Sequence, residues 1–319
     1  MEEIDSHIEK ALKGEKISIS RLISFVERGN NHAPYIMEKI YPHSGNAYYI
    51  GVTGPPGAGK STTVDRLVKQ FCRDQFSVGV IAVDPSSPFS GGALLGDRVR
   101  MNIKEKEYDY FFRSMSAGRV MGGLARTTKE SARILDASGR QIIIIETVGV
   151  GQSELDIAGA TDTVLVMLTP ESGDSVQIMK AGLMEIADIF VINKADREGA
   201  DGLAREVEAM LSMRQTDDGW AIPVLLTVAV KGQGIDELFA AIGKHREFLE
   251  FSRLLETKRK ERLRKRIKDI VTQRIQAILW EDEDAKRLVN DYLSNSDNSP
   301  DTPYTLAELL VKKLGIEKD

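Results

Sequence analysis

The stretch that decides the fold is Gly54-Pro55-Pro56-Gly57-Ala58-Gly59-Lys60-Ser61, which matches the pattern G-x-x-x-x-G-K-[ST]. An apolar run precedes it at Tyr49–Thr53, and a stretch with helical spacing follows it. In this strand–loop–helix context the glycines let successive backbone N–H groups curve around an anion at the positive end of the helix. We therefore expect residues 54–61, called the phosphate loop below, to bind a nucleotide.

The positions of the phosphate loop have distinct expected roles. Lys60 should reach the β- and γ-phosphates, and Ser61 should bind Mg²⁺ through its hydroxyl. The residues expected to contact the phosphates are Gly54, Pro56, Gly57, Ala58, Gly59, Lys60, Ser61 and Thr62. The alternative is an ordinary glycine-rich turn before a helix, which the flanking strand and helix disfavour.

Short apolar runs continue downstream and alternate with helical stretches. The expected strands are Tyr49–Thr53, Val78–Val83, Phe111–Met115, Ile142–Ile145, Val164–Leu168, Ile189–Ile192 and Val224–Val228. Several lack polar alternation, as strands buried on both faces do. This order predicts an α/β P-loop fold, with a mostly parallel sheet flanked by helices and ligands bound beyond the C-terminal strand ends.

The chain is expected to have three parts: a helical N-terminal extension at 1–46, the nucleotide-binding domain at 47–250 and a helical C-terminal arm at 251–319. Residues 251–270 hold nine basic and three acidic side chains, with Leu and Ile at helical spacing. That pattern favours a solvated amphipathic helix over a polyanion-binding segment. The last helix is expected to be capped by Thr305, with Glu308 three residues later.

The composition excludes several classes of protein. The chain has 319 residues, of which 42% are hydrophobic and 29% charged, and its net charge of -5 argues against a general nucleic-acid surface. No apolar stretch approaches the ~20 residues needed to cross a bilayer. The single cysteine, Cys72, excludes an intrachain disulfide, and four histidines leave little for a zinc site. We expect a cytoplasmic protein without nucleic-acid or membrane partners.

A second motif, Asn193-Lys194-Ala195-Asp196, follows a predicted strand and bears on the choice of base. Asp196 can accept two hydrogen bonds from the N1–H and N2 amino groups of guanine, whereas adenine has no such donor pair. Asn193 can bond the other edge of the base and neighbouring loops, and the Lys194 stem can lie along the purine face. The alternative is a helix cap, which the strand-end position after a phosphate loop disfavours.

Ala229 follows the last predicted strand, at the end of Thr227-Val228-Ala229. Its backbone N–H could bond the guanine O6. An ordinary strand-to-helix turn explains the same residues, so both interpretations stay open here.

Carboxylates at strand ends predict a metal site. Glu146 directly follows a buried aliphatic strand, where Mg²⁺ or water bound to it is the natural partner. Asp84 and Asp97 could also reach the metal, although each could instead be a turn or N-cap residue. Gly149 can bring its backbone to the γ-phosphate, and Gln152 either positions water or is a surface glutamine.

With these residues the chain resembles the MeaB/ArgK family of P-loop GTPases, of the SIMIBI class. The matching stretches are Gly54–Thr62, Val83–Pro88, Gly92–Met101, Glu146–Glu154, Gly173–Gly182 and Asn193–Asp196. The resemblance implies a GTP-dependent chaperone of an adenosylcobalamin-dependent acyl-CoA mutase, usually methylmalonyl-CoA mutase. Such a chaperone gates cofactor loading and protects the mutase.

The resemblance also implies site residues and an assembly. It places Mg²⁺ near Ser61, Asp84, Asp97 and Glu146, and it implies a third switch at Gly173–Gly182 that includes Lys180. It makes the C-terminal arm a homodimer contact. An older family label, a kinase of arginine/ornithine transport, gives the alternative function. A nickel chaperone is disfavoured, because only four histidines and one cysteine are present.

Overall fold

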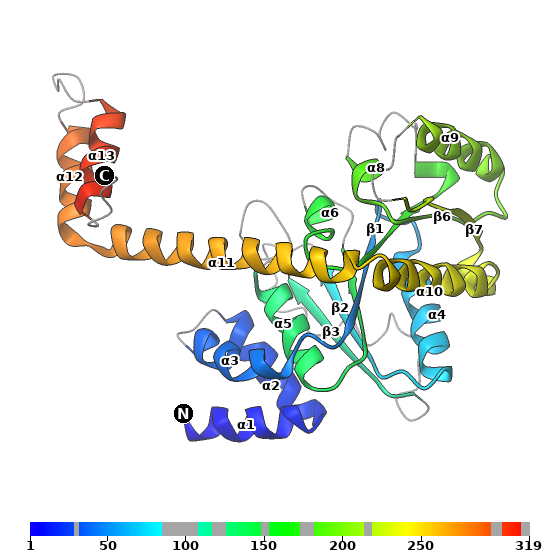
Figure 1. The fold of residues 1–319 in the computed structure, drawn as a ribbon, viewed down its shortest axis with the longest axis horizontal. Helices are drawn as coiled ribbons and strands as arrows, with labels where there is room; N and C mark the ends of the chain where they lie inside the picture. Colours follow the sequence, from blue (N-terminus) through cyan, green and yellow to red (C-terminus); the bar gives the residue numbers. More distant parts are fainter. Residues whose placement is uncertain are drawn as a thin grey trace. The chain divides into compact units, whose positions relative to one another are not determined.

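The structure is a computed structural model of the whole chain. It describes residues 1–28, 32–84, 108–116, 126–147, 153–172, 182–213, 219–294 and 302–313. The chain forms two compact units, Met1–Glu256 and Thr257–Asp319, whose elements are labelled in Figure 1. Each unit is described by itself below.

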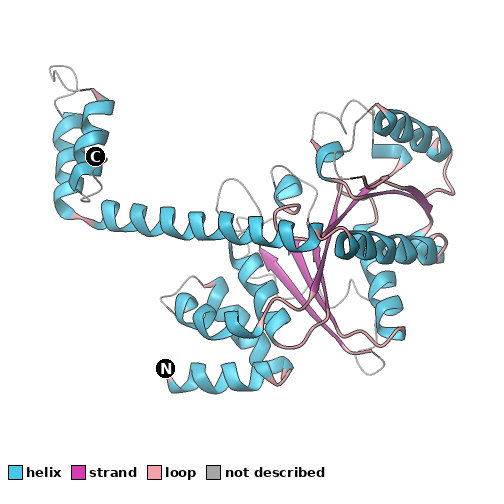
Figure 2. Ribbon diagram, in the orientation of Figure 1, coloured by secondary structure: helices cyan, strands magenta, loops and turns pink. Residues whose placement is uncertain are grey.

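The first unit is built on a seven-stranded sheet (Figure 2). Its strands are β1 (Tyr48–Thr53), β2 (Val78–Asp84), β3 (Tyr110–Ser116), β4 (Ile142–Glu146), β5 (Thr163–Leu168), β6 (Ile189–Asn193) and β7 (Val224–Thr227). The strand order is β3-β2-β4-β1-β5-β6-β7, and every neighbouring pair is parallel. All seven strands expected from the sequence are confirmed, with ends that differ by a residue.

Helices cover both faces of this sheet. They are α1 (Glu2–Leu12), α2 (Lys16–Glu27), α3 (Ala33–Ile40), α4 (Lys60–Arg73), α5 (Arg126–Ala137), α6 (Ser153–Asp156), α8 (Leu183–Ile186), α9 (Ala200–Ser212) and α10 (Ile235–Phe251). Short 3₁₀ turns stand at η1 (Tyr41–His43), η2 (Pro170–Ser172) and η3 (Ala229–Lys231).

The strands bury alternate residues in different cores, because side chains of a strand point to opposite faces. In β4, Ile142 and Ile144 join a core that contains residues of α4 and α10. Ile143 and Ile145 join a second core, with residues of α1, α2, α3 and α5. A third core lies between α9 and strands β5 and β6. The uninterrupted isoleucine run is therefore explained by burial on both faces.

The segment between the N-terminal helices and β1 is held by polar contacts. The buried Asp136 of α5 accepts hydrogen bonds from the backbone N–H groups of Gly45, Asn46 and Ala47, at 2.6, 3.1 and 3.1 Å. It also accepts one from the Tyr49 hydroxyl at 2.7 Å. The segment entering β1 is thus fixed to α5, and the boundary expected at residue 46 stays a prediction.

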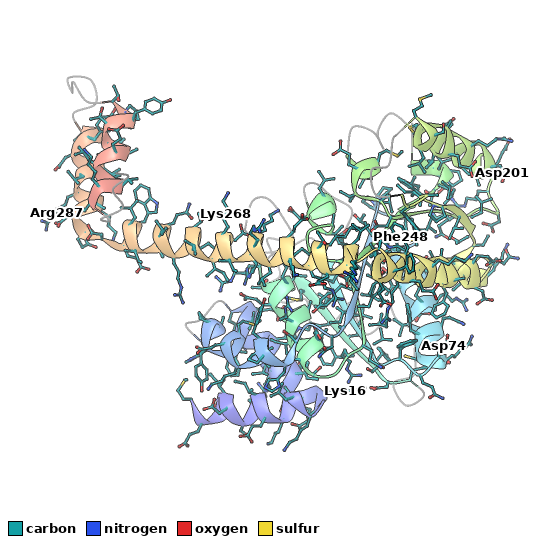
Figure 3. All side chains as sticks on the ribbon, viewed as in Figure 1. Lys16, Asp74, Asp201, Phe248, Lys268 and Arg287 are labelled. Atoms are coloured by element: carbon teal, nitrogen blue, oxygen red, sulfur yellow. The ribbon has the colours of Figure 1, made fainter. Side chains whose placement is uncertain are left out.

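The second unit contains most of α11 (Leu254–Glu281), α12 (Glu283–Ser294) and α13 (Pro303–Lys313). Figure 3 marks Lys268 on α11 and Arg287 on α12. Ala285 and Leu310 are the buried side chains of α12 and α13. Among the described helices, none combines the length and the apolar character that a membrane span requires.

The cap expected for α13 is wrong by three residues. The helix begins at Pro303, and the hydroxyl of Thr302 accepts a hydrogen bond from the Thr305 N–H at 3.2 Å. Thr305 is therefore the third helical residue rather than the cap. Proline at the first helical position explains the shift, because proline needs no hydrogen-bond partner there.

Candidate functional site

The phosphate loop joins β1 to α4 and requires glycine at two positions. Gly54 and Gly59 have φ angles of 135° and 88°, in the region that favours glycine. A Cβ atom on Gly54 would lie 2.0 Å from the carbonyl oxygen of Met167, and one on Gly59 would lie 2.1 Å from Nδ2 of Asn193. Both glycines therefore allow close contacts between the loop and neighbouring strands.

Lys60 is the first residue of α4 and its side chain is buried, with 6% of its surface exposed. Its Nζ donates to the carbonyl oxygens of Gly54 and Pro55, at 2.8 and 3.0 Å. The ammonium group thus lies within the phosphate loop, at the end of α4 where the helix dipole is positive. This arrangement concentrates positive charge where a nucleotide's phosphates would lie.

Ser61 and Glu146 meet beside the phosphate loop. The Ser61 hydroxyl donates to Oε1 of Glu146 at 2.6 Å, and Glu146 is only 9% exposed at the end of β4. A hydroxyl and a carboxylate are oxygen ligands of the kind that Mg²⁺ prefers. The described residues include no group of three or more His, Cys, Asp or Glu suited to a metal. Mg²⁺ usually takes one or two protein carboxylates and completes its shell with water and phosphate.

The ends of β1 and β4 are held together next to this pair. The Thr147 hydroxyl donates to the Thr53 hydroxyl at 2.9 Å, and the Thr147 N–H donates to the carbonyl oxygen of Val52 at 3.0 Å. These bonds fix the end of the strand that carries Glu146. The carboxylate is therefore positioned by rigid sheet structure rather than by a loop.

Several predicted site residues cannot be placed. Asp97, Gly149, Gln152 and Lys180 lie outside the described residues. Asp84 ends β2, which places its backbone at the same edge of the sheet as Glu146. The metal, catalytic and switch roles of these five residues stay predictions.

Asn193 connects the phosphate loop to the loop after β7. It is 4% exposed, and its Nδ2 donates to the carbonyl oxygen of Ala58 at 2.8 Å. Its Oδ1 accepts bonds from the Thr227 hydroxyl and the Ala229 N–H, both at 3.1 Å. Asn193 thus makes the contacts to neighbouring loops that the sequence predicted. The bond from Ala229 to the guanine O6 stays a prediction, since that N–H here donates to Asn193.

Asp196 lies at the surface near the same loop, with 40% of its side chain exposed. Its Oδ2 accepts a hydrogen bond from Nζ of Lys231 at 2.9 Å. This bond lowers the pKa of the Asp196 carboxyl below its ordinary value. Asp196 therefore stays ionised at neutral pH, as an acceptor for the two guanine donors must.

Lys194 adopts a left-handed backbone with φ of 59°, and its Nζ lies 3.2 Å from Oε2 of Glu171. Arg197 pairs with the same glutamate. Glu171 stands in η2, so these ion pairs fix the segment after β5 to the motif after β6. Surface pairs of this kind contribute little stability, so their effect is chiefly positional.

Three residues of the site carried no signal in the sequence. Lys231 stands out only because the fold brings it to Asp196, and Glu171 only because it meets Lys194. Arg66 of α4 donates to two carbonyl oxygens in η3. Charged residues in a helix or a loop usually indicate a solvated face. The partners are separated in the sequence by 35 residues for Lys231 and Asp196, by 23 for Glu171 and Lys194, and by 163 for Arg66 and Ala229.

Known proteins resemble this chain over nearly its whole length. A Pyrococcus horikoshii protein provisionally named a GTPase is 45% identical over 321 residues, covering 98% of this chain and 99% of that protein. The GTPase ArgK of Escherichia coli is 33% identical, covering 93% and 92% of the two chains. A crystal structure titled as a LAO/AO transport system kinase superposes with a TM-score of 0.72 at 28% identity, covering 98% and 97%.

The family model described as "Methylmalonyl Co-A mutase-associated GTPase MeaB" matches residues 19–284. The matched range includes the phosphate loop, Glu146 and the Asn193–Asp196 motif. It also runs through α10 and α11 into α12. The resemblance seen in the sequence is confirmed, and the chain belongs to the MeaB family of P-loop GTPases.

Proposed function

We propose that this GTPase is Mg²⁺-dependent and acts in the cytoplasm as a chaperone for an adenosylcobalamin-dependent acyl-CoA mutase, with GTP loading and hydrolysis gating cofactor delivery. The observation that carries the proposal is the linkage through Asn193, which bonds the phosphate loop at 2.8 Å and the loop after β7 at 3.1 Å. The segments expected to hold the phosphates and the base are therefore joined through one buried side chain. The family description names a mutase-associated GTPase, which supports the partner.

Three residues would act on the triphosphate. Lys60 supplies a buried positive charge at the phosphate loop, and Ser61 and Glu146 supply oxygen ligands for the metal. Bound Mg²⁺ would neutralise charge that develops on the phosphates. Since phosphoryl transfer needs positioning and charge stabilisation, this set accounts for part of the catalysis.

The remaining proposed groups form the switches. Gly149 would bond the γ-phosphate through its backbone, Gln152 would position the attacking water, and Lys180 would act in the third switch. Loss of the γ-phosphate removes the Gly149 contact and lets that loop relax. We expect slow hydrolysis by the chain alone, because no arginine finger is identified, and faster hydrolysis when a partner orders these segments.

The base assignment is tested by Asp196→Asn. The amide replaces a guanine-selective acceptor with a donor that suits the 2-oxo group of xanthine, so preference should shift from GDP towards xanthosine diphosphate. The measurement is the dissociation constant of each nucleotide by calorimetry. Unchanged selectivity for GDP would refute the assignment of guanine recognition to Asp196.

The partner is tested by co-purification with candidate adenosylcobalamin mutases, with and without a non-hydrolysable GTP analogue. The chain should bind one mutase in a nucleotide-dependent way, and that mutase should accelerate GTP hydrolysis. Lys60→Ala is the control, because it should remove nucleotide-dependent binding. Fast hydrolysis by the isolated chain that no mutase changes would contradict the proposal.

A phosphotransferase is the second candidate, because the crystal structure of a LAO/AO transport system kinase superposes on this chain with a TM-score of 0.72. Such an enzyme needs an acceptor site and a general base near the γ-phosphate, and no catalytic loop of the H-R-D type is visible in the sequence. Incubation with γ-labelled GTP and a candidate transport protein separates the two. Labelled protein would favour the kinase, and release of labelled phosphate alone would favour the GTPase.

The C-terminal arm is proposed as the homodimer contact. No side chain of α11 is buried, and Leu263, Ile267 and Val271 repeat at four-residue intervals with 40%, 54% and 49% exposed. An apolar stripe of this kind is typical of a helix that packs on a partner. Ile267→Asp should convert a dimer to a monomer in light scattering, whereas the control Ile17→Asp, at a 69% exposed position of α2, should not. A dimer that survives Ile267→Asp counts against the arm.

A further inference from the structure

Arg66 lies on α4, the helix that begins in the phosphate loop, and reaches the loop that follows β7. Its Nε donates to the carbonyl oxygen of Ala229 at 3.0 Å, and its Nη2 donates to that of Val230 at 2.7 Å. Both acceptors belong to η3, the 3₁₀ turn at Ala229–Lys231. One guanidinium therefore binds two consecutive carbonyl groups of that turn.

The same turn carries the groups that face the proposed base site. Lys231 bonds Asp196 at 2.9 Å, and the Ala229 N–H lies 3.1 Å from Oδ1 of Asn193. The turn is thus connected to the Asn193–Asp196 motif on one side and, through Arg66, to the helix of the phosphate loop on the other. Arg66 and Ala229 are 163 residues apart in the sequence, so this contact joins two segments that the sequence does not bring together.

We propose that Arg66 is a positioning residue for base selection, which fixes η3 at a set distance from the phosphate loop. The inference rests on the proposed recognition of guanine by Asp196 and Ala229. A planar guanidinium presents two donors in a rigid fork, whereas lysine presents a single flexible ammonium. Arginine therefore holds both the position and the orientation of the turn, which a point charge would not.

Loss of the Arg66 guanidinium should weaken recognition of the base more than it weakens binding of the phosphates. Both hydrogen bonds described for Arg66 go to η3 and not to the phosphate loop, so the cradle around Lys60 and Ser61 should keep its geometry. In Arg66→Gln the turn loses two hydrogen bonds from a charged donor, so Ala229 and Lys231 are held less firmly relative to α4. The expected result is a fall of about tenfold in the ratio of GDP to ADP affinity, with ADP affinity changed less than about twofold.

The experiment measures GDP and ADP dissociation constants by calorimetry for the full chain and for Arg66→Gln, Arg66→Lys and Asp196→Asn. Arg66→Lys should recover part of the ratio, because it can serve one of the two carbonyl groups. Arg73→Gln is the matched control on the same helix, at an exposed position, and should leave the ratio unchanged. Thermal unfolding of each nucleotide-free variant is recorded in parallel.

A lowered ratio in Arg66→Gln, partly restored in Arg66→Lys, supports the inference. An unchanged ratio overturns it, and so does a lower melting temperature with equal weakening of GDP and ADP, which indicates a purely structural contact. The proposed function is tested separately in the same series. If the unmodified chain does not prefer GDP, or if Asp196→Asn keeps that preference, the base assignment fails irrespective of Arg66.

Discussion

The contact between Gly59 and Asn193 predicts that two glycines of one loop respond differently to the same substitution. Gly57 and Gly59 have similar positive φ angles, 77° and 88°. A Cβ atom on Gly57 would meet nothing within 4 Å, whereas one on Gly59 would lie 2.1 Å from Nδ2 of Asn193. Gly57→Ala is therefore a matched control, because it measures the free-energy cost of placing alanine in a left-handed backbone without the clash.

The magnitude follows from what Asn193 would lose. A left-handed backbone costs alanine about 1–2 kcal/mol at either position. Relief of the clash at Gly59 displaces a buried amide that makes three hydrogen bonds, at 2.8, 3.1 and 3.1 Å. Leaving its partners unsatisfied costs about 1–3 kcal/mol. We expect Gly57→Ala to lower the free energy of unfolding by about 1–2 kcal/mol and Gly59→Ala by about 2–5 kcal/mol.

Urea unfolding of the nucleotide-free chain measures both values, and a double-mutant cycle assigns the difference. In an Asn193→Ala background the clash is absent, so Gly59→Ala should cost no more than Gly57→Ala does. Equal destabilisation by the two single substitutions would refute the reasoning. A Gly59→Ala cost that persists in the Asn193→Ala background would refute it as well.

Three further predictions address separate parts of the first unit. Lys60→Ala should abolish GDP binding in calorimetry, while the circular dichroism spectrum and the melting temperature stay near those of the unmodified chain. Retained GDP binding would contradict the role given to the Lys60 ammonium group. Asp136→Ala leaves three backbone N–H groups and the Tyr49 hydroxyl without their acceptor. Urea unfolding should therefore show a free energy of unfolding lowered by about 3–5 kcal/mol. A decrease of less than about 1 kcal/mol would show that these hydrogen bonds contribute little. Burial raises the pKa of the Cys72 thiol to about 11, so iodoacetamide should react far more slowly than with free cysteine at pH 8 and faster as the pH rises towards 11. Equal rates for Cys72 and free cysteine at pH 8 would oppose this.

The strands could be predicted because they are short apolar runs, several of which have no polar alternation and are buried on both faces. Ile142–Ile145 has no polar residue, and the structure divides its four side chains between two cores. The phosphate loop could be predicted for a similar reason, since its glycines and Lys60 form a local pattern. Both signals are contained within a few consecutive residues.

Two residues that join distant segments, Arg66 and Lys231, could not be predicted. Arg66 and Lys231 meet partners that the sequence places far away, and neither residue type is unusual where it stands. The N-terminal helices gave an amphipathic pattern, which identifies an apolar face but not the α5 surface that covers it. The cap of α13 was misplaced because Thr302 and Thr305 are both plausible caps, and only Pro303 between them decides the first turn.

The central proposal is a single site that binds guanine and the phosphates together with Mg²⁺. The measurement is calorimetric titration of the nucleotide-free chain with GDP and with ADP, each with and without Mg²⁺. GDP should bind at least about tenfold more tightly than ADP, because adenine offers Asp196 no donor pair, and Mg²⁺ should tighten GDP binding. Absence of binding at millimolar GDP, or equal affinity for the two nucleotides, would contradict the central claim.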